Sequence, residues 1–220
     1  MNKGHIYLIE SQNRQVLAEM FMRFQEHYES PEFKDKTFSV EEFATWYSSK
    51  YGAFTYTQDW HGFNIPALIM APFRQGMFDP LTGQEKQLLE FCKNADKNSY
   101  IIGVTSKEDY FEETLRHEFA HAVFFTDSSY RQEVVSCLND YRIKELDSAL
   151  NDFGYCKDVL PDEANAYIMI EPDTVEDYIS VSNTKKLKKT LEIIFQRHFG
   201  FSLSHAQIPA LINRTKHILV

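Results

Sequence analysis

The stretch Thr114-Leu115-Arg116-His117-Glu118-Phe119-Ala120-His121-Ala122-Val123 places two histidines four residues apart, with a glutamate directly after the first. An α-helix has about 3.6 residues per turn, so His117 and His121 would lie on one helix face with their rings roughly 6 Å apart. Two imidazoles placed in this way can bind one tetrahedral Zn²⁺ ion. Glu118 would lie about 100° further round the same turn, where its carboxylate can reach a water molecule beside the ion. The stretch predicts a central helix that carries the site of a metal-activated hydrolase.

The residues around this histidine pair suit a helix that runs through a protein core. The neighbours on both sides of the pair are uncharged, namely Leu115, Phe119, Ala120, Ala122 and Val123. A buried helix needs such neighbours because burying an unpaired charge is costly. The segment from Ser106 to Pro161 contains no internal proline that would interrupt a helix.

This pattern resembles the extended consensus of the zincin metallopeptidases, in which Thr or Val stands three residues before the first His and a hydrophobic residue ends the motif. Thr114 and Val123 fill these two positions. The resemblance implies an α+β fold: a mostly helical zincin-like domain with a small mixed or antiparallel sheet next to the active-site helix. It also implies a Zn²⁺ cofactor, peptide-bond hydrolysis with Glu118 as the general base, and an edge strand at residues 100–104 that pairs with an extended substrate.

A catalytic zinc site needs a third protein ligand, and three interpretations are open. In the metzincin pattern Asp127 falls at the position of the third ligand, but Phe124 stands where a glycine lets the backbone turn back to the metal. In the gluzincin pattern the ligand is a glutamate on a later helix, and Glu163 lies in such a segment. The third interpretation takes an acid from between these positions: Glu133 first, then Asp140, Glu145 or Asp147. We predict His117, His121 and Glu163 as the metal ligands.

One further side chain follows from the choice of Glu163. Tyr167 lies one helical turn later and would share its face. It could hydrogen-bond a ligand or stabilise a developing oxyanion, or it could simply be a buried aromatic residue. The alternative to an enzyme is a non-catalytic zincin-fold protein that uses the metal site structurally or as a binding cleft.

Composition limits the classes of protein and of partner. The chain has 220 residues, of which 43% are hydrophobic and 15% aromatic, which is typical of a packed globular domain. We expect one domain over 1–220, with an N-terminal scaffold at 1–98, the zinc-site core at 99–170 and a helical part at 171–220. A net charge of -9 disfavours nucleic acid as a partner, and the lysines at 185–189 are interpreted as a solvated helix face.

Cysteine usage and hydropathy indicate the compartment. The chain has three cysteines without a Cys-x-x-Cys spacing, so neither a disulfide framework nor a thiolate zinc site is predicted. The apolar run Ile6–Ile9 is too short for the core of a signal peptide, and Ile65–Phe73 contains two prolines and cannot span a bilayer. We expect a cytoplasmic protein that acts on a peptide or protein substrate and has no membrane partner.

Periodicity and capping signals predict the other elements. We expect helices at 15–28, 39–52, 80–93, 130–153, 161–169 and 186–199, and the metal-site helix from about 106 to 125. The second of these has a capping box at Ser39 and Glu42, and the 130–153 helix ends at Gly154. Strands are predicted at 5–9, 54–63 and 100–104, with a turn at 60–62. His61 in that turn is interpreted as incidental.

Overall fold

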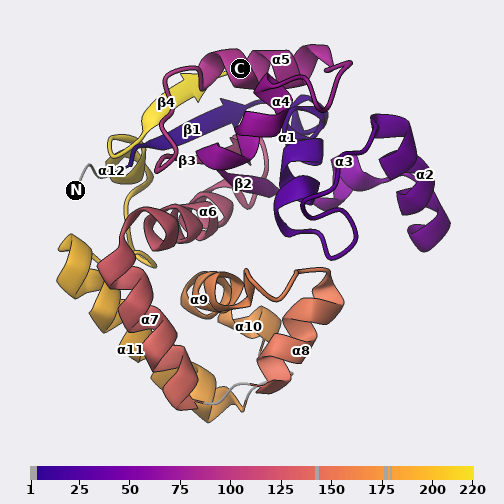
Figure 1. Ribbon diagram of the computed structural model, residues 1–220. Coiled ribbons are helices and arrows are strands. Elements are labelled where there is room, and N and C mark those ends of the chain that lie inside the picture. The colour runs from indigo at the N-terminus through magenta and orange to yellow at the C-terminus, as the bar shows by residue number, and fades with distance from the viewer. Residues whose placement is uncertain (1–3, 142–143, 176–177, 179) are drawn as a thin grey trace.

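The structure contains a four-stranded mixed sheet between two groups of helices (Figure 1). This computed structural model describes residues 4–141, 144–175, 178 and 180–220. The strand order is β2-β3-β1-β4, in which β1 is parallel to both β3 and β4, and β2 is antiparallel to β3. The strands are β1 (Ile6–Ser11), β2 (Gly62–Pro66), β3 (Tyr100–Thr105) and β4 (Lys216–Leu219). The predicted α+β class with a small mixed sheet is confirmed.

Both faces of the sheet are covered by helices. Successive side chains of a strand point to opposite faces, so Leu8 packs into one hydrophobic cluster while Tyr7 and Ile9 pack into the other. In β3 Ile101 joins the cluster of Tyr7, and Ile102 joins that of Leu8. This two-sided burial explains why these strands read as nearly continuous apolar runs in the sequence.

The first face is covered by helices of the N-terminal half. These are α1 (Arg14–Glu29), α2 (Val40–Tyr51), α3 (Tyr56–Asp59), η1 (Ala67–Met70), α4 (Ala71–Arg74) and α5 (Gly83–Phe91). Their shared cluster is rich in phenylalanine, and a buried ion pair lies beside it. The guanidinium of Arg23 on α1 donates to both carboxylate oxygens of Glu85 on α5, at 2.6 Å from Nε and 2.5 Å from Nη2. This pair joins the two helices.

The second face is covered by α6 (Phe111–Thr126), which lies between the sheet and α9 (Leu160–Ile170) in Figure 1. Alanines of both helices, among them Ala120 and Ala166, are fully buried in the same cluster, and such small side chains allow helices to approach closely. The remaining helices lie beyond them: α7 (Ser128–Tyr141), α8 (Lys144–Phe153), α10 (Pro172–Val175), α11 (Val181–Phe199) and α12 (Ile208–Ile212). The helix that carries the histidine motif is therefore enclosed on two sides.

Several predicted helix ends are confirmed. Ser39 and Glu42 form the predicted capping box of α2, which ends before Gly52 at a φ of 89°. Gly154 follows α8 at a φ of 110°, the left-handed conformation that favours glycine at a helix C-terminus. The predicted single helix over 130–153 corresponds to α7 and α8, and residues 142–143 between them lie outside the described part of the chain.

Two boundaries are wrong. Residues 54–63 do not form a strand: Tyr56–Asp59 is the short helix α3, in which Oδ2 of Asp59 accepts a hydrogen bond from Thr55 at 2.7 Å, and β2 begins only at Gly62. Helix α6 begins at Phe111 and not near Ser106, because the Ser106 amide still donates to Ser11 O at 2.9 Å and so extends the strand pairing.

The expected position of the sheet edge is also wrong. Residues 100–104 belong to β3, which is paired on both sides, by β1 and by β2. The edge strand next to α6 is β2. Any substrate that approaches this border of the sheet therefore meets β2 and not β3.

Within the described residues, no helix combines the length and apolarity that crossing a lipid bilayer requires.

Candidate metal centre

Helix α6 turns both histidines of the motif toward α9. His117 is 8% exposed and His121 is 1% exposed, and their ring centroids lie 4.9 Å apart. Four-residue spacing puts the rings on one face, and the fully buried Leu115 and Ala122 fix the rotation of the helix by packing into the core. The two rings are thus held side by side by the packing of α6.

Helix α9 brings a carboxylate to the same place. One ligand atom each from His117, His121 and Glu163 lie within 4.8 Å of one another, and all three residues are buried. Nε2 of His121 lies 3.7 Å from Oε2 of Glu163. Two ligands of a tetrahedral zinc ion lie about 3.3 Å apart, given zinc-ligand bonds of about 2.0–2.1 Å, so the arrangement is close to a zinc site. The structure brings together the three residues predicted as ligands.

Hydrogen bonding tests whether an ion fits between these residues. Nε2 of His121 and Oε2 of Glu163 are buried and make no hydrogen bond within the described residues. Each buried polar atom without a partner costs about 1–3 kcal/mol. Burial raises the pKa of Glu163 well above its usual range, and the charge of Glu29 raises it further. Two imidazoles and one carboxylate form a donor set that suits zinc.

Each histidine also lies beside a second carboxylate. Nδ1 of His117 lies 2.8 Å from Oε1 of Glu171, and Nδ1 of His121 lies 3.0 Å from Oδ1 of Asp162. A metal-binding histidine usually directs its other ring nitrogen to a carboxylate, which fixes the ring and strengthens the ligand. Both pairs lie at ion-pair distance without the geometry of a hydrogen bond, and Nε2 of His121 is the ring nitrogen that lies beside Glu163.

The sequence prediction did not include Asp162 and Glu171. Asp162 lies in the first turn of α9, where the helix dipole already favours an acid. Glu171 follows the last residue of α9, about two and a half helical turns after Asp162. In the sequence, these two residues are indicated by an acid near each end of the helix that carries Glu163.

Glu118 is placed beside the group of ligands and next to the edge of the sheet. It is 5% exposed, and its Oε2 atom makes no hydrogen bond within the described residues. Burial raises the pKa of Glu118 to about 7, although the charge of His117 and a hydrogen bond with Asn64 lower it. Asn64 of β2 is itself oriented, because the Tyr100 hydroxyl donates to its Oδ1 at 2.6 Å. A carboxyl group with this pKa can both take up and release a proton near neutral pH.

Gly62 allows β2 to approach this carboxylate. A Cβ atom added at Gly62 would lie 2.2 Å from Oε1 of Glu118 and 2.7 Å from Cγ2 of Thr114. Both distances are far below van der Waals contact, so no other residue fits here without displacing Glu118. The absence of a side chain at Gly62 therefore leaves the space that the Glu118 carboxylate occupies.

Tyr167 occupies the position that its spacing from Glu163 predicts. Its ring centroid lies 4.9 Å from that of His117, and its hydroxyl lies 3.2 Å from the hydroxyl of Tyr155. Burial raises the pKa of Tyr167, with a further contribution from the charge of Glu163. Tyr167 therefore keeps its proton at neutral pH and can donate a hydrogen bond.

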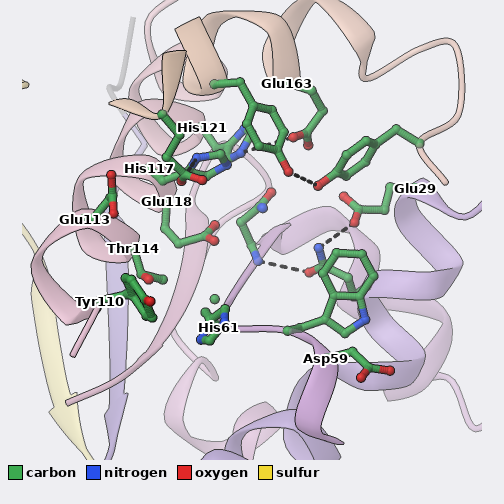
Figure 2. Close-up of a pocket in the computed structure, with 17 residues that line it drawn as sticks. Glu29, Asp59, His61, Tyr110, Glu113, Thr114, His117, Glu118, His121 and Glu163 are labelled. Carbon is green, nitrogen blue, oxygen red and sulfur yellow. Dashed lines mark hydrogen bonds and ion pairs between the residues drawn. The ribbon is translucent and has the colours of Figure 1, made fainter. Parts of the chain in front are cut away.

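These residues surround one cavity of about 370 Å³ (Figure 2). Helices α1, α6 and α9, strand β2 and the loops next to them contribute its walls. The lining residues are Gln25, Glu29, Asp59, Trp60, His61, Gly62, Asn64, Tyr110, Glu113, Thr114, His117, Glu118, His121, Tyr155, Glu163, Tyr167 and Glu171. His61, interpreted from the sequence as incidental, lies on this wall, where its ring centroid is 5.6 Å from that of Tyr110.

The other candidate third ligands lie elsewhere. Oδ1 of Asp127 accepts hydrogen bonds from the amides of Ser129 and Tyr130, both at 3.1 Å, and so caps the start of α7. Glu133 pairs with His198 at 2.9 Å and also with Arg197. Neither acid belongs to the group that could hold a metal, nor do Asp140, Glu145 and Asp147.

Comparisons of the chain with protein-family models, with curated proteins and with solved structures found no match. Its chemistry is therefore inferred from the residues of the site.

Proposed function

We propose that this protein is a zinc-dependent metallopeptidase in which His117, His121 and Glu163 hold the ion. The observation that carries the proposal is the convergence of these three buried side chains, each with an atom that makes no hydrogen bond within the described residues, beside the buried carboxyl group of Glu118. The carboxylates beside both Nδ1 atoms support it further. A group arranged only for packing would not need this set of polar atoms.

The side chains have distinct roles in the proposed reaction. When bound, zinc supplies Lewis acidity, which makes a water molecule acidic enough to ionise near neutral pH and polarises a carbonyl group. Glu118 takes up the proton of the attacking water and delivers it to the nitrogen of the leaving amine. Tyr167 donates a hydrogen bond to the carbonyl oxygen as negative charge develops on it. Tyr155 and His117 hold the Tyr167 ring in position.

A peptide is the substrate class that the cavity suits best. Polar side chains line it from several elements, and the edge strand β2 borders it at Gly62 and Asn64. Peptide substrates are often held beside a strand at the border of a sheet, and in β2 Gly62 is the residue that is not buried, since Gln25 occupies the Asn64 amide. The resemblance of the histidine motif to that of the zincin metallopeptidases points to the same substrate class.

The proposal is tested first by the metal content of the purified protein. Elemental analysis of the wild type should give one zinc per chain, and Glu163→Ala should lose most of it, because a stable site needs three protein ligands. Asp127→Ala is the matched control and should keep its zinc. Full zinc in the Glu163 variant would move the third ligand elsewhere.

The second test separates an enzyme from a zinc protein without catalysis. A degenerate peptide library is digested with the wild type and with Glu118→Gln, and the products are read by mass spectrometry. Glu118→Gln should keep its zinc and lose about 100-fold or more in turnover, which is the usual contribution of a general base. A wild type that contains zinc and cleaves nothing would favour a structural or ligand-binding role for the site.

A further inference from the structure

Glu29 is an acidic residue of the cavity that the proposed reaction does not use. It is the last residue of α1 and is 8% exposed. Its Oε1 atom accepts a hydrogen bond from Nε2 of Gln25 at 2.7 Å, whereas its buried Oε2 atom has no hydrogen-bond partner in the described part of the chain. Figure 2 shows the Glu29 carboxylate on the side of the cavity opposite Glu118. One carboxylate oxygen is therefore left for a ligand.

The position of this carboxylate is fixed from several sides. Oε1 of the Gln25 side chain accepts a hydrogen bond from the backbone amide of Asn64 at 2.9 Å. Because this fixes the orientation of the side chain, its Nε2 atom faces Glu29. The backbone oxygen of Glu29 accepts from the Cys156 amide at 3.0 Å. Such contacts hold the side chain in place, so the unpaired oxygen is a built feature of the cavity wall.

Two aromatic residues stand next to Glu29. Trp60 and Tyr155 line the cavity with it, and the same three residues also line a neighbouring cavity of about 330 Å³. Glu29, Trp60 and Tyr155 therefore form a wall that the two cavities share. Aromatic faces and a carboxylate together suit a long side chain that ends in a cation, because the chain packs on the rings and the charge meets the acid.

The charge of the cavity also requires a cation. Its lining includes six acidic residues and neither lysine nor arginine: Glu29, Asp59, Glu113, Glu118, Glu163 and Glu171. Glu163, Glu118 and Glu171 have proposed roles at the metal centre, and none of them offers Glu29 a positive partner. Burial raises the pKa of Glu29 well above its usual range, and the charges of Glu26 and then Glu118 raise it further, because the ionised form is costly in this place. A positive group would remove this cost.

We propose that Glu29, Trp60 and Tyr155 form a subsite that binds a lysine or arginine side chain of the substrate next to the scissile bond. This inference rests on the proposed peptidase function and names its substrate class. It predicts that Lys or Arg occupies one fixed position beside the cleaved bonds.

The cleavage test compares the wild type, Glu29→Gln and Glu90→Gln on the same peptide library. Glu90 is an exposed acid of α5 and is the matched control. Lys or Arg should be enriched at one position next to the bonds that the wild type and Glu90→Gln cleave. Glu29→Gln should lose this preference, with kcat/KM reduced about tenfold or more for arginine peptides and little for peptides with neutral citrulline, since a charged hydrogen bond contributes about 1.5–3 kcal/mol.

A binding test does not depend on turnover. Zinc-loaded Glu118→Gln, with and without Glu29→Gln, is titrated calorimetrically with peptides that carry arginine or citrulline. The arginine peptide should bind about tenfold more tightly only where Glu29 is present. Equal binding to both peptides, or an arginine preference that survives Glu29→Gln, overturns the subsite.

The two tests separate failure of the subsite from failure of the function. Cleavage that is lost in Glu118→Gln but shows no preference for a basic residue rejects the subsite and leaves the peptidase standing. Absence of cleavage by a zinc-loaded wild type rejects the peptidase, and the binding test then still decides on Glu29. Loss of zinc in Glu29→Gln would make Glu29 part of the metal centre and would also overturn the proposal.

Discussion

Individual atoms set the character of this site, above all the ring nitrogens of the two histidines. Nδ1 of His117 and Nδ1 of His121 each lie at ion-pair distance from a carboxylate. This arrangement places a carboxylate beside one nitrogen of each ring, which is where the partner of a ligating histidine usually lies. We therefore expect Glu171 and Asp162 to position the two proposed histidine ligands.

We expect Asp162→Asn and Glu171→Gln each to weaken zinc binding about 10–100-fold, because partners of ligating histidines usually contribute this much. Competition with a chromophoric chelator measures the affinity. Asp173→Asn, at an exposed acid of α10, is the control and should bind zinc as the wild type does. Unchanged affinity in both Asp162→Asn and Glu171→Gln would mean that the carboxylates do not support the ligands.

Gly62 sets the space that is available to Glu118, the proposed general base. Gly62→Ala would force its new Cβ against Oε1 of Glu118, which is 2.2 Å away, so the carboxylate or the strand must move. A displacement of about 1 Å at a reacting group can cost about 100-fold in rate. We expect turnover to fall by about one to two orders of magnitude while zinc content stays unchanged.

Steady-state kinetics and elemental analysis check this expectation. Gly83→Ala is a matched control, since a Cβ atom added there meets nothing within 4 Å. Wild-type turnover in Gly62→Ala would show that the strand and Glu118 can adjust at no cost.

At the scale of helices and strands, the half of the fold without metal ligands is held together by a buried ion pair. Arg23 of α1 and Glu85 of α5 are 2% and 1% exposed. Arg23 also donates to the backbone oxygens of Phe38 and Phe78, at 3.2 and 3.1 Å. One side chain thus joins α1 to two connecting segments and to α5.

Removing one partner of such a pair leaves an uncompensated buried charge. We expect Arg23→Ala to lower the free energy of unfolding by about 3–5 kcal/mol. Lys93→Ala, which breaks the exposed Lys93–Glu90 pair, should cost no more than about 1 kcal/mol. Urea denaturation followed by circular dichroism measures both, and equal losses would contradict the difference expected from burial.

The proposed ion would join α6 to α9 in the other half. Because zinc would bind the folded chain, it should raise the free energy of unfolding by about 2.7 kcal/mol when the free zinc concentration is 100 times the Kd. We expect the melting temperature to rise with zinc and to fall back with a chelator. Glu163→Ala should abolish the rise.

Hydrogen exchange locates this effect within the molecule. Zinc should slow amide exchange in α6 and α9 more than in α5, which lies on the other face of the sheet. Uniform slowing would indicate general stabilisation of the chain without a specific link between the two helices.

For the whole molecule, short-range patterns predicted the elements well, because they depend on neighbours along the chain. The histidine spacing predicted the helix of His117 and His121, and the Ser39–Glu42 box predicted the start of α2. Glu163 was predicted from the resemblance to gluzincins, and the structure places it next to His121. Residues that are close in sequence, or that belong to a known motif, could thus be predicted.

Residues that reach the site through tertiary packing were not predictable. Glu29 and Asn64 come from α1 and β2, and only the folding of the N-terminal half brings them to α6. The importance of Gly62 depends on a distance between two elements. Strand β4 is short and largely exposed, so it carries no hydrophobic alternation, and it forms only because β1 offers a free edge.

The hydrogen bond between Gln25 and the Asn64 amide has one more effect on the molecule. An edge strand whose amide groups are free can template pairing between copies of a protein, but β2 is buried from Phe63 to Pro66. The Gln25 side chain already occupies the Asn64 amide, as a neighbouring strand otherwise would. The helix that supplies Glu29 to the cavity therefore also protects the open side of the sheet against aggregation.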